Sequence, residues 1–365
     1  MNFYFYFLLG IFFYNYFISS LFMIIIALYG IKMILSNQPL INKLKKNKIE
    51  KNAKISIIIP IYNEEVNLPK LINSILLNDT ENIEFIFVND SSTDKSLKIL
   101  KESKVNYFKI VDLQKQKLVC NVLNEGLKVA NKYSDFIGVI NGDCHIDSDC
   151  FRKVKFRLNN YDINALNLNN TTKNNTNFVS KIASMEKSYK SHLFVFNESS
   201  LNNGYFISRN LFNKWDTITE DQNLALVIKK NGSNIYQDPN INIYDSVPNS
   251  FTKLMSQKYR WIYGDMYNRF KFKPQNIFDI IVSIYYLFPL YSITTLLTLT
   301  YQNNYILNIQ SIIILIEIVL FLKSKKYRIK YIPLAIFYGI YQFTFQIYFY
   351  AKFIYSKFLN LEVKW

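Results

Sequence analysis

Long apolar runs lie near both ends of the chain and leave a more polar region between them. The first run, Phe3–Leu35, contains one basic residue, Lys32, and no acidic residue. A helix needs roughly 20 apolar residues to cross a bilayer, so this run is long enough to span once, with a tight two-helix hairpin as the alternative. Three further runs of suitable length lie at 280–301, 305–322 and 331–355. The pattern predicts membrane-spanning helices on both sides of a central soluble region.

The central region alternates between strand and helix patterns. Residues 55–61 are continuously apolar, which is typical of a buried parallel strand. The pattern predicts further strands at 83–88, 107–111 and 136–140, and helices at 64–77, from Asp94 onward and at 121–132. Strands that alternate with helices indicate a doubly wound α/β sheet covered on both faces.

The pattern is more mixed after residue 160. The stretch 167–177 is mostly Asn and Thr, which predicts an exposed loop. The last helix, at 251–272, mixes basic and aromatic residues, so we expect it to lie along the membrane surface. The remaining predicted elements are strands near 163–168, 204–208 and 233–237 and helices near 178–190 and 219–231.

Basic residues flank the predicted spans. Residues 37–54 carry six lysines against one glutamate, and the connector 323–330 carries five basic residues. The positive-inside rule then predicts a multi-pass cell-membrane protein with both segments and the central region in the cytoplasm. Attraction to anionic membrane lipids explains the net charge of +16. Nucleic-acid binding is disfavoured, because the central region has no aromatic–basic binding motif.

The three cysteines indicate free thiols, because an odd number in a cytoplasmic region does not suggest disulfides. Two of them stand in a group that could suggest zinc. Its spacing matches no common zinc framework, and Asp147 is expected to begin a helix. We therefore favour an ordinary polar segment over zinc for the group Cys144, His145, Asp147, Asp149 and Cys150.

Three polar clusters follow predicted strands. They are residues 60–64 after the first strand, 89–94 after the second and 141–143 after the fourth. In open α/β sheets, ligands bind beyond the carboxyl ends of the strands. Three clusters that converge on one edge predict a ligand site there.

The first two clusters resemble motifs of glycosyltransferase family 2, which has the GT-A fold. The stretch IPIYNEE is similar to the family's nucleotide-side opening motif, so Pro60, Tyr62 and Glu64 are expected to bind the nucleotide-sugar. The stretch NDSSTD resembles the DDxSxD motif, with Asn89 at the first aspartate position. The resemblance implies that Asp90 contacts a uracil base.

The third cluster, NGD, resembles the family's DxD metal motif. Asn141 replaces the first aspartate and Asp143 matches the second. The resemblance implies Mg²⁺ or Mn²⁺, since a hard cation with oxygen ligands neutralises a departing diphosphate. Asn141 can supply only a neutral amide oxygen. The family also often has a lysine at the position of Val119, and Lys117 is the nearby candidate for a phosphate contact.

Thr219-Glu220-Asp221 resembles the TED motif of membrane-bound family members. The aspartate of TED acts as the general base, which implies this role for Asp221, with Glu220 as the next candidate. A helix that begins here, with Thr219 as its cap and acids in its first turn, is compatible with that role.

Gln257-Lys258-Tyr259-Arg260-Trp261 matches the QxxRW motif of the same enzymes. The resemblance implies that Arg260 contacts the donor diphosphate. It also implies that Gln257 and Trp261 belong to the acceptor site, where an aromatic face suits a sugar ring.

The resemblance and the apolar pattern together predict a domain order. A GT-A catalytic domain at 55–250 and an interfacial helix with QxxRW at 251–278 form the central part. The flanking parts are a transmembrane segment at 1–36, a basic linker at 37–54, three transmembrane helices at 279–355 and a tail at 356–365.

The implied reaction is inverting transfer of a sugar from a UDP-sugar to a glycan acceptor in polysaccharide synthesis. The alternatives are glycosylation of a membrane lipid and a non-catalytic membrane protein that keeps the fold as a binding module. Few membrane spans are expected, so a homo-oligomer or a partner subunit is an open prediction.

Overall fold

The structure is a computed structural model that describes residues 46, 52–103, 105, 107–172, 176–184, 201, 203–216, 219–233 and 235–271. The predicted membrane segments at 1–36 and 279–355 and the tail at 356–365 lie outside these residues. Among the helices of this described part, none combines the length and the apolar character that a membrane crossing requires.

The first half of the sheet is parallel, as predicted. β1 (Ile55–Ile61) lies between β2 (Ile83–Asn89) and β4 (Phe136–Val139), and β3 (Phe108–Asp112) pairs with the outer side of β2. β1 is buried except at Pro60, which explains its continuous apolar sequence. The carboxyl ends of these strands meet at one edge, where the predicted polar clusters begin.

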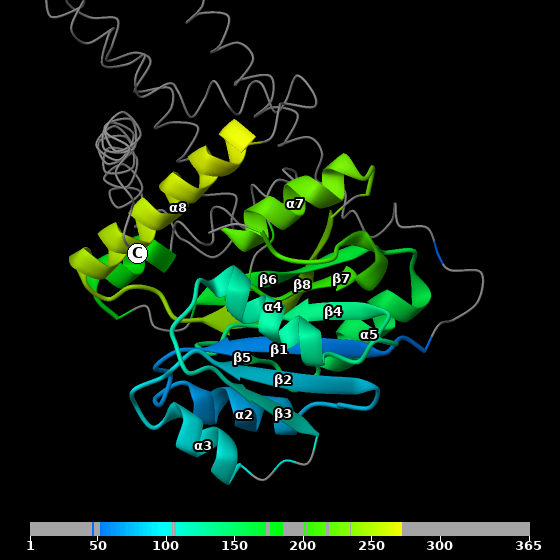
Figure 1. Cartoon of the computed structure of the whole chain (residues 1–365), viewed down its shortest axis with the longest axis horizontal. Coiled ribbons are helices and arrows are strands. Elements are labelled where there is room, and N and C mark those ends of the chain that lie inside the picture. The colour runs from blue at the N-terminus through cyan, green and yellow to red at the C-terminus, as the bar shows by residue number, and fades with distance from the viewer. Residues whose placement is uncertain are drawn as a thin grey trace, which may run out of the picture. The chain divides into compact units, whose positions relative to one another are not determined.

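The second half of the sheet is mixed. β7 (Tyr205–Ser208) runs antiparallel to β4 and to β6 (Ala165–Thr172). β8 (Ile235–Asp245) runs parallel to β6, and β5 (His145–Ile146), a short strand absent from the prediction, pairs antiparallel with β8. Within the described residues the strand order is β3-β2-β1-β4-β7-β6-β8-β5. Figure 1 shows its first part, β3-β2-β1-β4.

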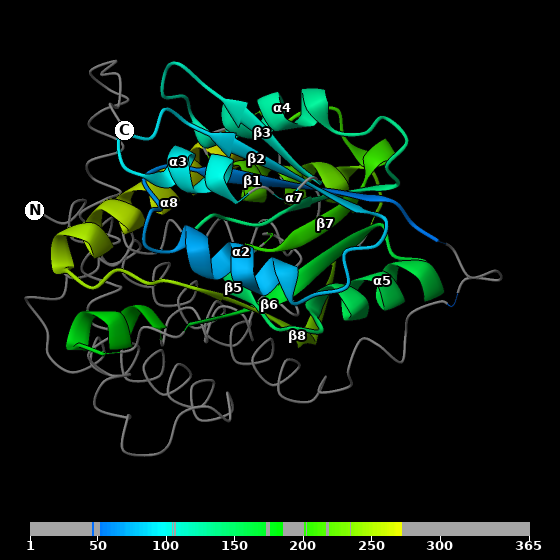
Figure 2. The same cartoon turned by 90° about the horizontal axis from the view of Figure 1, so that it is seen from below.

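Helices cover both faces of the sheet, which confirms the predicted α/β class. One face carries α2 (Leu68–Leu76), α3 (Ser96–Glu102) and α5 (Cys150–Asn160). The other face carries α4 (Val119–Val129) and α7 (Glu220–Lys230), whose apolar residues share one core with alternate residues of the parallel strands. Figure 2 shows α4 on one side of the sheet and α2 and α5 on the other. The last described helix is α8 (Phe251–Lys271).

The prediction of an exposed loop at 167–177 is wrong for its first half, because β6 runs through Thr172. Leu168 is fully buried, and β6 lies between β7 and β8, which satisfy its backbone. The amide side chains also find partners: Asn169 Nδ2 donates to Asn242 Oδ1 at 2.8 Å and Asn170 Nδ2 to Asp245 Oδ2 at 3.2 Å. Tertiary pairing therefore overrides the local preference of Asn for loops.

Candidate active site

The loops that follow β1 and β2 hold each other through reciprocal hydrogen bonds. The backbone N–H of Thr93 donates to Asn63 Oδ1 at 2.8 Å, and the N–H of Asn63 donates to Ser92 Oγ at 3.1 Å. The N–H of Glu65 donates to Asp94 Oδ2 at 2.9 Å. The serine and the last aspartate of NDSSTD thus hold the IPIYNEE loop and leave the first residues of each motif at the sheet edge.

Asp90 lies directly beyond β2 and is nearly buried. Its Oδ1 accepts the backbone N–H of Lys117 at 2.8 Å, while Lys117 Nζ pairs with Glu125 Oε1 at 2.7 Å. Burial raises the pKa of the Asp90 carboxyl, and the hydrogen bond from Lys117 partly offsets the rise. Lys117 therefore contacts the predicted uracil-binding residue through its backbone N–H, while its ammonium group pairs with the carboxylate of Glu125.

The NGD turn packs against the loop after β1. A Cβ on Gly142 would lie 2.5 Å from Ile61 Cδ1, 3.1 Å from the Pro60 carbonyl oxygen and 3.3 Å from Glu64 Cγ. Only glycine fits this approach without displacement, so the turn brings Asp143 next to the IPIYNEE loop. Burial raises the pKa of the Glu64 carboxyl. Tyr62 of the same loop is exposed.

Asn203, which the sequence reasoning missed, holds the NGD turn from the segment before β7. Its Oδ1 accepts the backbone N–H of Asn141 at 3.0 Å. The thiol of Cys144 in turn donates to Asp143 Oδ1 at 3.5 Å. No local pattern around Asn203 marks it, because its partner lies 62 residues away along the chain.

Glu220 and Asp221 form the first turn of α7, so the predicted helix start at Thr219 is confirmed. Both side chains are half-buried. Burial raises the pKa of both carboxyls, and the charge of Asp221 raises the pKa of Glu220 further. Their charges also contribute to the raised pKa of Tyr205 at the start of β7, which places the acids near the carboxyl end of β4.

α8 brings Arg260 to the same acids. The positive charge of this exposed guanidinium lowers the pKa of both Glu220 and Asp221 and partly offsets the effect of burial. Gln257, Arg260 and Trp261 are spaced by three and four residues and so share one face of the helix. The two later motifs, which are about 40 residues apart in sequence, therefore meet in the fold.

One face of Trp261 is occupied by a buried lysine. Lys258 Nζ lies 4.9 Å from the centroid of the Trp261 ring, within the range of a cation–π interaction. Burial lowers the pKa of Lys258 to about 7. A sugar ring that stacks on Trp261 would therefore use the opposite face of the indole.

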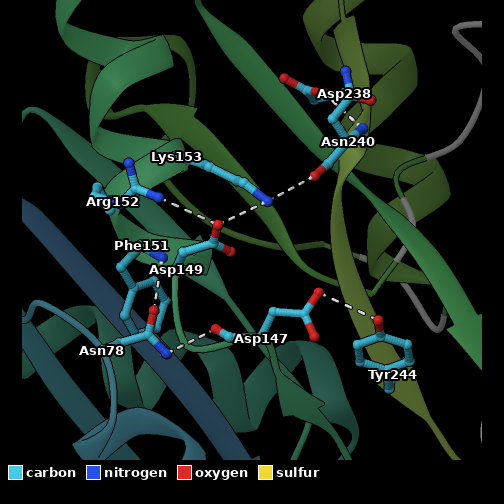
Figure 3. Close-up of polar contacts among 9 residues, drawn as sticks. All are labelled: Asn78, Asp147, Asp149, Phe151, Arg152, Lys153, Asp238, Asn240 and Tyr244. Carbon is cyan, nitrogen blue, oxygen red and sulfur yellow. Dashed lines mark hydrogen bonds and ion pairs between the residues drawn. The ribbon is translucent and has the colours of Figure 1, made fainter.

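The two aspartates of the group that could suggest zinc are engaged in structural contacts (Figure 3). Asp147 accepts a hydrogen bond from the Tyr244 hydroxyl at 3.2 Å, and Asp149 pairs with Arg152 and Lys153 at the start of α5. The helix begins at Cys150 rather than at Asp147. Within the described residues, no three His, Cys, Asp or Glu side chains gather as metal ligands.

The NGD residues fit a magnesium-type ion whose ligands come partly from the protein and partly from a substrate. Asp143 offers a carboxylate and Asn141 an amide oxygen, at the sheet edge beside Pro60 and Glu64. Mg²⁺ is usually held by one or two carboxylates together with substrate phosphates and water. A single carboxylate agrees with this mode and does not suit an ion bound by protein alone.

The fold and the acidic sheet edge define a GT-A-like α/β domain. Residues 56–231 match the family described as Glycosyl transferase family 2, and this part of the chain belongs to that family. The chain therefore carries a glycosyltransferase domain.

Curated relatives are polysaccharide synthases. The chain is 28% identical over 240 residues to a poly-beta-1,6-N-acetyl-D-glucosamine synthase of Staphylococcus epidermidis, which covers 60% of this chain and 57% of the relative. It is 25% identical over 240 residues to the enzyme of the same name from Staphylococcus aureus (strain COL), which covers 61% of this chain and 57% of the relative. The chain thus matches little more than half the length of either relative.

A solved structure supports the fold. A mannosyltransferase from Pyrobaculum calidifontis, in complex with GDP-Man and Mn2+, superposes with a TM-score of 0.62 over 95% of this chain and 98% of its own. Its sequence identity is 13%, so this similarity concerns the fold alone.

Proposed function

We propose that the chain transfers a sugar from a UDP-sugar to a hydroxyl of a growing glycan, with inversion at the anomeric carbon. The observation that carries the proposal is the acid pair Glu220–Asp221. Both acids are half-buried at the start of α7, and the positive charge of Arg260 acts on both carboxyls. A base beside a fixed positive charge suits a reaction in which one oxygen loses a proton while a diphosphate departs.

Asp221 acts as the general base in this proposal. It takes the proton of the acceptor hydroxyl, whose oxygen then forms a bond to the anomeric carbon while the bond from that carbon to the diphosphate oxygen breaks. Burial raises the pKa of Asp221, which makes its carboxylate a stronger base than an exposed aspartate. UDP leaves with the electron pair, and Arg260 stabilises its negative charge.

The donor site in this proposal lies at the carboxyl edge of β1, β2 and β4. Asp90 binds the uracil base, and Pro60, Tyr62 and Glu64 line the nucleotide side. Asp143 and Asn141 would hold a divalent cation, which would neutralise the negative charge of the diphosphate. The fit of one carboxylate to a substrate-shared ion supports this assignment.

The polysaccharide acceptor is supported by the relatives, which are named as synthases of poly-beta-1,6-N-acetyl-D-glucosamine. UDP-N-acetylglucosamine is accordingly the first donor to test. The apolar runs at both ends of the chain support a membrane-embedded enzyme whose catalytic domain faces the cytoplasm.

Membranes that contain the full chain test this proposal when they are incubated with a panel of UDP- and GDP-sugars and UDP or GDP release is measured. We expect release from one UDP-sugar together with a polymeric product. Matched membranes with Asp221→Asn are the control for other transferases. A lipid-linked product would replace the glycan acceptor by a lipid, and no release above the control from any donor would contradict catalysis.

A further inference from the structure

Asn268 lies on the same face of α8 as the QxxRW residues. It follows Arg260 by eight residues and Gly264 by four, spacings that keep all three on one stripe of a helix. Asn268 has no exposed surface. Burial of an amide is costly unless its hydrogen bonds are made, so the hydrogen-bond partners of Asn268 indicate its structural role.

Within the described part of the chain, the side-chain partners of Asn268 are Thr219, directly before α7, and residues of the first turn of that helix. Its Nδ2 donates to Thr219 Oγ1 at 2.8 Å, and its Oδ1 accepts from Asn223 Nδ2 at 3.4 Å. The carbonyl of Thr219 accepts the N–H of Asn223 at 3.0 Å, which is the first bond of the helix. One amide thus holds the residue before the acids and the residue that closes their turn.

This arrangement connects two groups that must stand at a fixed separation. Glu220 and Asp221 directly follow Thr219, and Arg260 lies about two helical turns before Asn268 on α8. The bond between Asn268 and Thr219 therefore fixes the start of α7 relative to the helix that carries the guanidinium. A displacement of about 1 Å at a reacting group can cost on the order of 100-fold in rate.

We propose that Asn268 is a positioning residue that holds the acid pair of α7 in register with Arg260 of α8. It touches neither substrate nor reacting atoms, and acts through Thr219. Its effect on catalysis rests on the proposed function, whereas its effect on the start of α7 does not.

A double-mutant cycle in the full chain tests the bond itself. Asn268→Leu removes the amide at similar volume, and Thr219→Val removes the hydroxyl at the same shape. We expect each single variant to lower kcat by about 10- to 100-fold while donor KM stays within about twofold of wild type. The kcat of the double variant should be no lower than that of the less active single variant. Additive losses, or a loss confined to KM, would overturn the proposal.

Two matched variants separate positioning from general damage. Thr219→Ser keeps the hydroxyl and should retain kcat close to wild type. Asn231→Leu makes the same amide-to-apolar change beyond the far end of α7, where Asn231 is exposed and donates to the Leu211 carbonyl at 3.4 Å, and should leave kcat unchanged. A similar loss of kcat in Asn231→Leu would assign the effect to the stability of α7 as a whole.

Amide hydrogen exchange supplies a measurement that does not need activity. Asn268→Leu should speed exchange in residues 219–224 while residues 225–230 and β1 stay close to wild type. If the wild type transfers no sugar but this exchange pattern appears, the proposed function fails and the positioning contact stands. If the wild type is active and exchange at 219–224 is unchanged in the variant, the positioning role is wrong.

Discussion

Gly264 of α8 lies directly against Thr219 at the start of α7. A Cβ on Gly264 would be 2.2 Å from Thr219 Cγ2, 2.6 Å from its Oγ1 and 3.0 Å from its Cβ. Glycine inside a helix costs about 1 kcal/mol relative to alanine, so this position accepts a penalty for close approach of the two helices. The contact brings the backbone of the QxxRW helix onto the TED segment.

Gly264→Ala should therefore separate the two helices. Forcing a methyl group into this contact should destabilise the fold by about 1–3 kcal/mol and lower the melting temperature of the full chain by several degrees. Sugar transfer should fall by more than UDP binding does, because the proposed contacts of Asp90 and Asp143 with the nucleotide lie outside α8 and only that of Arg260 is on it. Thr219→Ala in the same background removes the two closest atoms but also the hydroxyl that accepts from Asn268, so it should recover only part of the melting temperature and none of the rate. An unchanged melting temperature in Gly264→Ala would contradict the contact.

Activity should require a divalent cation bound at the NGD motif. Asp143→Ala removes its only carboxylate and should lower transfer by at least about 100-fold, since a metal ion supplies several kcal/mol of charge stabilisation. Asn141→Asp adds a second charged oxygen and should lower the Mg²⁺ or Mn²⁺ concentration needed for half-maximal rate. Titration of each metal into chelator-treated enzyme measures both effects, and full activity in excess chelator would disprove the requirement.

The rate should fall at low pH as Asp221 becomes protonated. The active form is the carboxylate, and burial raises its pKa, so activity should be lost at a higher pH than an ordinary aspartate requires. Arg260 lowers that pKa, so Arg260→Gln should move the acid limb of the kcat profile to higher pH. Arg260→Lys keeps the charge and should leave the limb closer to wild type. If the acid limb of the kcat profile stays in place in Arg260→Gln, Arg260 does not influence the pKa of the general base.

The basic segments at 37–54 and 323–330 should face the cytoplasm. Single cysteines in place of Lys48 and Lys325 should resist an impermeant thiol reagent in intact cells and react after permeabilisation. Background labelling should be low, because Cys120, Cys144 and Cys150 are buried. Labelling of either position in intact cells would reverse the orientation.

The parallel half of the fold was predictable from sequence because each element there has a local cause. β1, for example, is a continuous apolar run buried on both faces. In the mixed half, the start of α7 was predictable for a similar reason, since Thr219 and two acids stand there in order. The polar clusters at the strand ends were predictable for the same reason, since parallel strands bring their carboxyl ends to one edge.

The missed features depend on partners distant in the chain. The second half of β6 was predicted as a loop, because Asn169 and Asn170 find their side-chain partners on β8, some 70 residues later. Asn203, Gly264 and Asn268 carry no motif of their own, and only the fold reveals what they contact. Gly264 did offer one signal, since a glycine within a predicted helix suggests a close packing contact.

The most direct test of the central claim is a comparison of sugar transfer and UDP binding in Asp221→Asn. Asparagine keeps the shape of aspartate but cannot take a proton, so transfer should fall by roughly 100- to 10,000-fold. Calorimetric titration of the same preparation should give a UDP affinity close to that of the wild type, because Asp90, Asp143 and Arg260 are unchanged. Near wild-type transfer by Asp221→Asn would contradict the account and make Glu220 the next candidate for the base.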